Sequence, residues 1–162
     1  MSEKKLTHLD ADGQSHMVDV SDRDVTVRTA QASGHVNLSA EVITMLRDKT
    51  VPKGDVLATA RIAGIMGAKR TPDLIPLCHP IALHSVTVEC EIDDSGVAII
   101  AKVKTADRTG VEMEALTAVS VAALTVIDMV KAVDPSAAIS FVHVDSKDCL
   151  LYTSDAADEG LG

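Results

Sequence analysis

The sequence predicts an α+β fold in which helices cover one face of an antiparallel sheet. Three observations favour it: helical apolar spacing before residue 70, an alternating pattern between residues 83 and 106, and a long helical segment followed by a final strand. This order matches a sandwich of the ferredoxin-like type. With 162 residues, the chain has the length of one domain with a single core.

The first half of the chain contains two short extended candidates and two predicted helices. Val18–Val20 and Val25–Val27 are rich in β-forming residues. Residues 39–48 have apolar spacings of three and four, and Ser39 stands before them as a cap. The Ala-rich segment Asp55–Lys69 carries an apolar stripe at helical spacing. We therefore expect the chain to become helical near residue 40.

The second half predicts a β-hairpin, a long helix and a last strand. The hairpin pairs residues 83–92 with 97–106 across the turn sequence Asp-Asp-Ser-Gly. A capping box formed by Thr109 and Glu112 starts the helix, which we expect over Val111–Val133. The final strand is expected at Ala138–Val144.

The long helix has an unusually apolar composition. It carries no charged residue between Glu114 and Asp128, and apolar side chains occupy every side of it. Because one sheet face cannot cover all sides, either a subunit interface or another helix must cover the rest. We favour the interface and expect an oligomer.

Composition excludes several classes of function. The formal net charge is −9, and the only aromatic residues are Phe141 and Tyr152, so the chain lacks the basic surface and stacking platforms of nucleic-acid binders. The uncharged stretch Ala115–Ile127 in the long helix is too short for a membrane span. The three cysteines form no CxxC pair, and no signal-like apolar stretch opens the chain. We therefore expect a cytoplasmic protein without a metal centre.

Polar side chains interrupt the apolar pattern at four places, each with an ordinary structural explanation. They are Lys53-Gly54-Asp55 before a helix, Cys78-His79 in a turn between two prolines, Glu112-Met113-Glu114 at a helix start, and the pair Asp128 and Lys131. Helix-start charges, a structural histidine and a surface ion pair would account for them without catalysis. Alternatively, Asp128 holds Lys131 for proton transfer.

The length of the helix constrains any common site. Glu112 and Asp128 are sixteen residues apart, or about 24 Å at 1.5 Å per residue. One nucleotide-sized ligand cannot touch both ends of the same helix. If both ends act, the pocket should draw on two subunits.

Three long segments resemble one family. His16–Arg28, Lys53–Pro80 and Thr109–Asp134 resemble the MoaC family, the cyclic pyranopterin monophosphate synthases of molybdenum cofactor biosynthesis. The resemblance covers most of residues 6–148 and implies a ferredoxin-like protomer. It also implies conversion of a 3′,8-cyclised dihydro derivative of GTP to cyclic pyranopterin monophosphate, with release of pyrophosphate and no redox change.

The resemblance also assigns roles to residues of this chain. Asp128, Lys131 and Lys53 would be catalytic, exchanging protons while the pterin ring is built and the cyclic phosphate closes. Substrate contacts would come from Leu77, Cys78, His79, Met113, Glu114, Glu112, Arg28 and Lys69, with the two basic residues facing the triphosphate.

Assembly and partners follow from the same resemblance. It implies a homohexamer built as a trimer of dimers, with pockets at a dimer interface, and a radical SAM GTP cyclase that supplies the substrate. It implies no cofactor of the protein's own, with Mg²⁺ as an optional companion of the substrate phosphates. Neither nucleic acid nor membrane is an expected partner.

Two departures from the family pattern stand out. Arg23 occupies a position where many members have lysine. After Asp148, the family's Gly-Gly-Lys-Ser-Gly segment is replaced by residues 149–162, whose letters resemble a translated sequencing adapter. We interpret residues 1–148 as one synthase domain and 149–162 as a non-native tail, and expect an intact fold with reduced turnover.

Two alternatives remain at this point: a truncated synthase that binds its nucleotide without turnover, and a non-catalytic ferredoxin-like module that binds an anion or serves as a scaffold. Convergence of Lys53, Asp128 and Lys131 in one place would favour the enzyme, whereas scattered positions would favour the scaffold.

Overall fold

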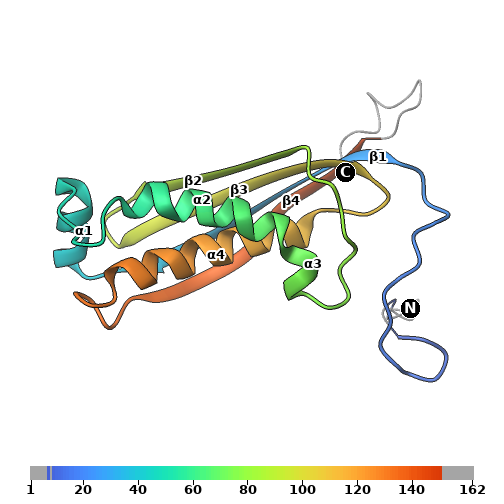
Figure 1. The fold of residues 1–162 in the computed structure, drawn as a ribbon, viewed down its shortest axis with the longest axis horizontal. Coiled ribbons are helices and arrows are strands. Elements are labelled where there is room, and N and C mark those ends of the chain that lie inside the picture. The colour runs from blue at the N-terminus through green and yellow to red at the C-terminus, as the bar shows by residue number, and fades with distance from the viewer. Residues whose placement is uncertain (1–6, 8, 151–162) are drawn as a thin grey trace.

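A computed structural model describes residue 7 and residues 9–150. Its elements are β1 (Thr26–Asn37), α1 (Ala40–Asp48), α2 (Val56–Lys69), α3 (Thr71–Leu74), β2 (Ser85–Ile92), β3 (Gly96–Asp107), α4 (Glu112–Val130) and β4 (Ala138–Leu150). The strands form one antiparallel sheet in the order β2-β3-β1-β4. Helices α2 and α4 run along one face of that sheet (Figure 1). The predicted α+β, ferredoxin-like architecture is confirmed.

Side chains predicted to start the first two helices do so. The Ser39 hydroxyl accepts the backbone N–H of Val42 at 3.3 Å and caps α1. The Asp55 carboxylate accepts the N–H of Ala58 at 3.0 Å and caps α2. Both bonds satisfy an N–H group that the helix itself leaves without a partner.

The predicted capping box of the long helix is wrong. The N-cap of α4 is Val111, which makes no side-chain cap hydrogen bond, and Glu112 is the first helical residue. The Glu112 carboxylate instead pairs with Lys147 at 3.6 Å. Because the helix begins at Glu112, with Val111 as its N-cap, Thr109 lies two residues before the cap position and cannot cap the helix.

The end of α4 also differs from the prediction, since the helix stops at Val130 and not near Val133. Asp134 is 4% exposed, and its carboxylate accepts the backbone N–H of Ser39 at 2.7 Å. It also accepts the hydroxyl of Ser136. The hydrogen bond to Ser39 holds Asp134 against the start of α1. The chain therefore leaves the helix before the apolar pattern of the sequence ends.

Strand β1 is longer than the valine pattern indicates, and Val18–Val20 lies in no strand. The helix-facing positions of β1 include Ala30, Ala32 and Gly34, which carry little apolar signal. A Cβ at Gly34 would lie 2.6 Å from a methyl carbon of Val119. Small residues are thus required here because α4 packs directly on the strand.

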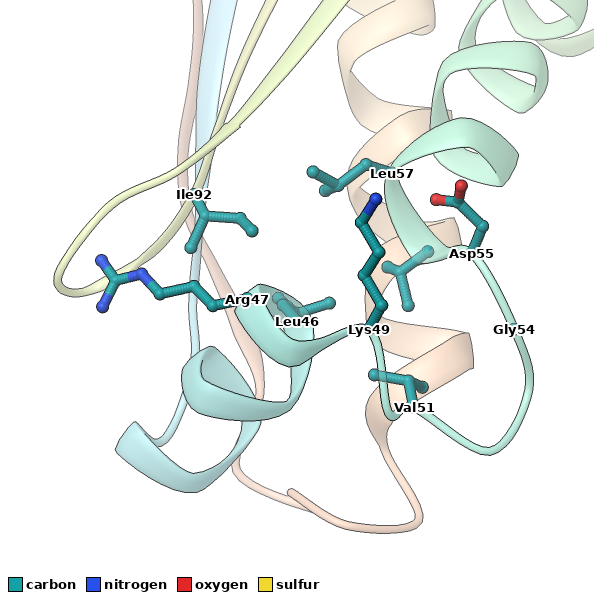
Figure 2. Close-up of a pocket in the computed structure, with 9 residues that line it drawn as sticks. Leu46, Arg47, Lys49, Val51, Gly54, Asp55, Leu57 and Ile92 are labelled. Atoms are coloured by element: carbon teal, nitrogen blue, oxygen red, sulfur yellow. The ribbon is translucent and has the colours of Figure 1, made fainter.

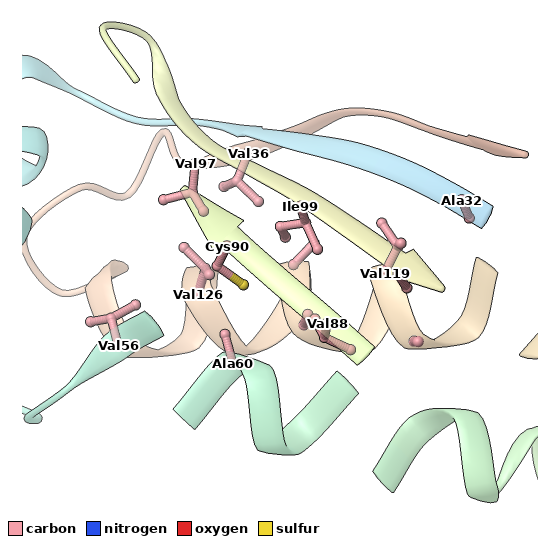
Figure 3. Packing of buried hydrophobic residues seen from close by; sticks show 14 of the residues in the cluster. Ala32, Val36, Val56, Ala60, Val88, Cys90, Val97, Ile99, Val119 and Val126 are labelled. Carbon is pink, nitrogen blue, oxygen red and sulfur yellow. The ribbon is translucent and has the colours of Figure 1, made fainter. Parts of the chain in front are cut away.

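The core lies between the sheet and the two long helices (Figure 3). Val36, Val97, Ile99 and Val126 are fully buried in it. Burial of such aliphatic side chains is the main stabilising contribution to a domain of this size.

Helix α2 covers part of the surface of α4 that faces away from the sheet, which is the second explanation given for its apolar composition. Leu124 of α4 stays exposed, and the favoured interface stays a prediction. A Cβ at Gly64 would lie 2.9 Å from the carbonyl oxygen of Ala118, which shows how closely the helices approach. Ten of the nineteen residues of α4 are buried. The helix is long and apolar enough to cross a membrane, but half of its most apolar window is buried inside the fold.

The last strand, β4, extends further than the predicted Ala138–Val144. It pairs with β1 as far as Leu150, opposite Val27, and thus crosses the expected domain boundary at residue 148. Residues 151–162 of the predicted tail lie outside the described residues.

Candidate functional site

Lys53, Asp128 and Lys131 converge at one end of the helix layer, and we call them the lysine–aspartate cluster. The Nζ of Lys131 donates to Oδ1 of Asp128 at 2.6 Å. The Nζ of Lys53 donates to the backbone carbonyl of Asp128 at 3.0 Å and lies 3.6 Å from Oδ2 of its carboxylate. Residues far apart in sequence thus form one charged group.

Local backbone features place these side chains. Lys53 lies in the loop between α1 and α2, and the next residue, Gly54, has a φ of +109°, a conformation that side-chain-bearing residues rarely adopt. Asp128 lies in the last turn of α4, and Lys131 is its C-cap. Both lysines therefore stand at the negative end of the helix dipole, which favours cations.

The cluster is open to solvent on this protomer. The side chains of Lys53, Asp128 and Lys131 are 48%, 58% and 59% exposed. The hydrogen bond from Lys131 and the charges of both lysines hold the pKa of Asp128 below its usual value. Asp128 is therefore an anion at neutral pH and can orient two ammonium groups toward a ligand.

A second group of predicted residues gathers at the other end of α4, around a cavity of about 280 Å³ that we call the Cys–His pocket. Its predicted lining residues are Leu77, Cys78, His79, Glu112, Met113 and Glu114. Residues that the sequence analysis did not assign to it also line it, among them Val18, Val20, Arg23 and Ile81. The turn after α3 and the first turn of α4 therefore form one concave surface.

The N-terminal segment completes this pocket through His79. The Nε2 atom of His79 lies within hydrogen-bond distance of the carbonyl oxygen of Val18. Since a carbonyl only accepts, Nε2 carries the proton. The other ring nitrogen, Nδ1, is left for a different partner. No local pattern in the sequence predicted this contact, because it joins segments sixty-one residues apart.

Glu114 is the most deeply buried acid in the Cys–His pocket, at 3% exposure. Burial, together with the nearby charge of Glu112, raises the pKa of Glu114 to about 7. Burial and the charge of Glu114 also raise the pKa of the Cys78 thiol. The pocket thus holds an acid that exchanges its proton near neutral pH beside an un-ionised thiol.

Glu112 also lines an adjoining cavity of about 570 Å³, the Arg28 cavity, together with Arg28, Lys147 and Cys149. Arg28 donates from Nε to the carbonyl of Asp107 at 3.2 Å, which anchors its guanidinium. The sequence analysis missed Lys147. Its position opposite Ala30 on β1 brings it to the helix-facing side of the sheet, a register the sequence alone does not reveal.

Lys69 is the one predicted substrate contact that joins none of these groups. It is the exposed last residue of α2 and lines neither the Cys–His pocket nor the Arg28 cavity. The lysine–aspartate cluster and the Cys–His pocket lie at opposite ends of α4, about 24 Å apart by helical rise. One protomer therefore presents two separate groups of candidate site residues.

The described part of the chain contains no group of three His, Cys, Asp or Glu side chains arranged to hold a metal ion. These two groups of side chains can exchange protons and bind anions. Paired lysines with a carboxylate lie at one end of α4, and a histidine, a carboxyl group with a pKa of about 7 and an arginine lie at the other.

Comparison with known proteins points to one family. A model of the MoaC family matches residues 17–149. The chain is 67% identical over 146 residues to the cyclic pyranopterin monophosphate synthase of Streptomyces griseus, covering 90% of this chain and 82% of the relative. The corresponding protein of Streptomyces avermitilis is 64% identical, with 90% and 86% covered. That of a Nocardioides species is 60% identical, with 90% and 91% covered.

Proposed function

The chain belongs to the MoaC family, and we propose that it is a cyclic pyranopterin monophosphate synthase of molybdenum cofactor biosynthesis. The observation that carries this proposal is the convergence of Lys53, Asp128 and Lys131. This convergence is the arrangement expected of the enzyme, whereas in a scaffold the three side chains were expected at scattered positions.

The substrate of the proposed reaction is the 3′,8-cyclised dihydro derivative of GTP, supplied by a radical SAM GTP cyclase. Its triphosphate needs cationic partners despite the overall charge of −9. Arg28 and Lys147 in the Arg28 cavity provide them locally, with Lys69 as a further contact. The products are cyclic pyranopterin monophosphate and pyrophosphate.

The lysine–aspartate cluster is the proposed source of proton transfer. Asp128 holds the ammonium of Lys131 at 2.6 Å and that of Lys53 at 3.6 Å. Fixed in this way, the two ammonium groups can give protons to the departing groups during ring opening and closure. The neutral amine that each donation leaves can then take a proton from an attacking group. The carboxylate keeps both in place and balances their charge.

The Cys–His pocket is the proposed site for the ring system. Nδ1 of His79 and the buried carboxyl of Glu114 supply polar contacts. Leu77 and Met113 supply apolar contacts on either side. Glu114, with a pKa of about 7, can meet the ring either as a donor or as an acceptor.

A complete site is proposed to need two protomers, because the two groups of candidate site residues in one chain lie at opposite ends of α4. Apolar side chains on the outer side of the helix layer are unusually exposed for a monomer: Ile62 at 61%, Met66 at 51% and Leu124 at 57%. We propose that they lie in contacts between copies, within the homohexamer, a trimer of dimers, that the family resemblance implies. We place the enzyme in the cytoplasm.

The chemistry requires no cofactor of the protein's own in this proposal. Proton transfer and anion stabilisation by side chains suffice for a rearrangement without redox change, and Mg²⁺ enters only with the substrate phosphates. Chelation with EDTA is therefore expected to weaken substrate binding at most.

The direct test gives the purified chain the 3′,8-cyclised GTP derivative and measures pyrophosphate release together with pterin formation. GTP itself serves as the control substrate. We expect turnover of the cyclised compound alone. Saturable binding without turnover would indicate the truncated alternative, and neither binding nor turnover would overturn the proposal in favour of a scaffold.

A further inference from the structure

A cavity of about 490 Å³ lies among α1, the loop of residues 49–55, the start of α2 and the end of β2 (Figure 2). It is lined by Leu46, Arg47, Lys49, Val51, Gly54, Asp55, Val56, Leu57 and Ile92. None of the residues assigned above to catalysis or substrate contact lines it. Its volume falls within the range of roughly 300–1,000 Å³ that small-molecule sites occupy.

The walls of this cavity are mainly aliphatic. Leu46, Val51 and Val56 form a buried base. Leu57 and Ile92 are half-buried and stand on opposite walls, from α2 and from β2 (Figure 2). No aromatic side chain lines it. The walls therefore suit a flexible aliphatic group better than a stacked ring.

Three charged side chains border the cavity, and two of them are already engaged. Arg47 pairs with the carboxylate of Asp94 at 3.1 Å. The Asp55 carboxylate caps α2 through the N–H of Ala58. Lys49 takes part in none of the ion pairs formed among the described residues. One cation is thus available to a ligand.

The backbone fixes Lys49 at the cavity. It is the C-cap of α1, with a φ of 57° and its N–H directed to the carbonyls of Leu46 and Met45. Figure 2 shows its side chain running from the loop toward Leu57 and Asp55. An ammonium group therefore stands beside an aliphatic wall, an arrangement that matches a carboxylate attached to a hydrocarbon chain.

We propose that this cavity is a second ligand site, which binds a small amphipathic carboxylate with its hydrocarbon chain between Leu57 and Ile92 and its carboxylate on Lys49. The ligand also contacts the loop of residues 49–55, several of whose residues line the cavity. The same loop carries Lys53, which donates to the backbone carbonyl of Asp128. A ligand in the cavity therefore touches the loop that holds Lys53, a proposed catalytic residue.

The test is a methyl NMR titration of the full chain with octanoate. Octanoate is expected to shift the methyl signals of Leu57 and Ile92 in a saturable manner. Two control compounds separate the contributions: octanol has the same hydrocarbon chain without charge, and acetate has the charge without the chain. Both are expected to bind at least tenfold more weakly than octanoate.

A matched pair of variants tests the charge. Lys49→Met keeps an unbranched side chain at the same backbone conformation but removes the ammonium, and should weaken octanoate at least tenfold. Lys102→Met, at an exposed position on β3, should leave the affinity unchanged. If Lys49→Met fails to fold, Lys49→Arg should retain binding and Leu57→Asn should lose it.

Absence of methyl shifts at Leu57 and Ile92 up to millimolar octanoate would overturn the proposal. So would equal binding of octanol, or full affinity in Lys49→Met. Because the readout is binding and not turnover, the result does not depend on whether the chain is a synthase.

Discussion

At the residue scale, the proposed function depends most on the charge of Asp128. Two ammonium groups lie against this one residue, yet all three side chains are about half exposed. Exposed ion pairs contribute little to folding stability. A cluster of this kind is therefore better explained by chemistry than by stability, and the two effects can be separated by substitution.

Asp128→Asn should lower turnover by on the order of a hundredfold or more, because the amide no longer fixes or balances the two lysines. The free energy of unfolding should change by less than about 1 kcal/mol. Steady-state pyrophosphate release and urea unfolding measure the two quantities. Asp94→Asn, at a fully exposed carboxylate, is the control, and equal turnover in both variants would argue against the cluster.

Glu114 is a single buried group that makes the free energy of unfolding depend on pH. Its pKa rises from 4.5 to about 7 on folding, chiefly through burial. The folded state therefore holds the proton more tightly, and stability is lost as pH rises through this interval. The loss should amount to on the order of 3 kcal/mol between about pH 5 and pH 8.

Glu114→Gln should remove most of this pH dependence, since an amide does not titrate. Urea unfolding of both proteins across that range provides the comparison, and the difference between them isolates Glu114 from every other titrating group. Parallel curves for the two proteins would show that Glu114 ionises as readily in the fold as in the unfolded chain.

At the element scale, the close packing of α2 on α4 explains how so apolar a helix is accommodated in a small domain. Gly64 and Gly67 let the helices approach until a Cβ at either position would come within 3.0 Å of α4. In an exposed helix, glycine to alanine stabilises by roughly 0.5–1 kcal/mol. Here the missing side chains are part of the contact.

Gly64→Ala should therefore destabilise the protein despite its better helix propensity, by about 1–3 kcal/mol of unfolding free energy. Its Cβ would meet the Ala118 carbonyl, which is backbone and cannot rotate away. Arg61→Ala, at an exposed position of the same helix, should change stability by less than about 0.5 kcal/mol. A stabilised Gly64→Ala protein would mean that the helices separate easily.

Elements with local signals could be predicted from the sequence, and those that depend on tertiary contacts could not. Ser39 caps its helix as expected, and Asp55, expected as a charge at a helix start, caps the next one, because capping is a short-range effect. Most of β1 was not predicted, because its inward positions are alanine and glycine. These small residues are required there because α4 packs closely on the strand. The end of α4 was predicted three residues too late, because the hydrogen bond between Asp134 and Ser39 at the start of α1 is a tertiary contact.

The site residues also divide into those with a local signal in the sequence and those that only tertiary contacts bring together. Helical spacing placed Asp128 and Lys131 on one face, and their hydrogen bond follows from it. Lys53 was linked to them only through the family resemblance, and the fold supplies the physical reason, since its loop ends beside the last turn of α4. Lys147 had no local signal at all, because strand register alone carries it to Glu112.

At the scale of the whole molecule, the ends of α4 from two copies are proposed to build one site. Each protomer carries one lysine–aspartate cluster and one Cys–His pocket, separated by about 24 Å. In a symmetric pair of copies, each cluster would face the pocket of its neighbour. Each site would then take its cluster from one chain and its pocket from the other. Two different substitutions, one on each chain of a pair, would therefore leave one of the two sites intact.

Mixing the variants Asp128→Asn and Glu114→Gln is a direct test of a site shared between copies. Each should be inactive alone, Glu114→Gln because an amide cannot exchange a proton as the carboxyl group, with its pKa of about 7, does. After unfolding and joint refolding, random pairing should restore about a quarter of the wild-type turnover, because each mixed pair contains one site with both halves intact. Each variant refolded alone is the control. One variant is labelled with 15N so that the two chains differ in mass. Activity no higher than that of the separate variants, in a mixture shown by this label to contain mixed assemblies, would contradict a site shared between copies.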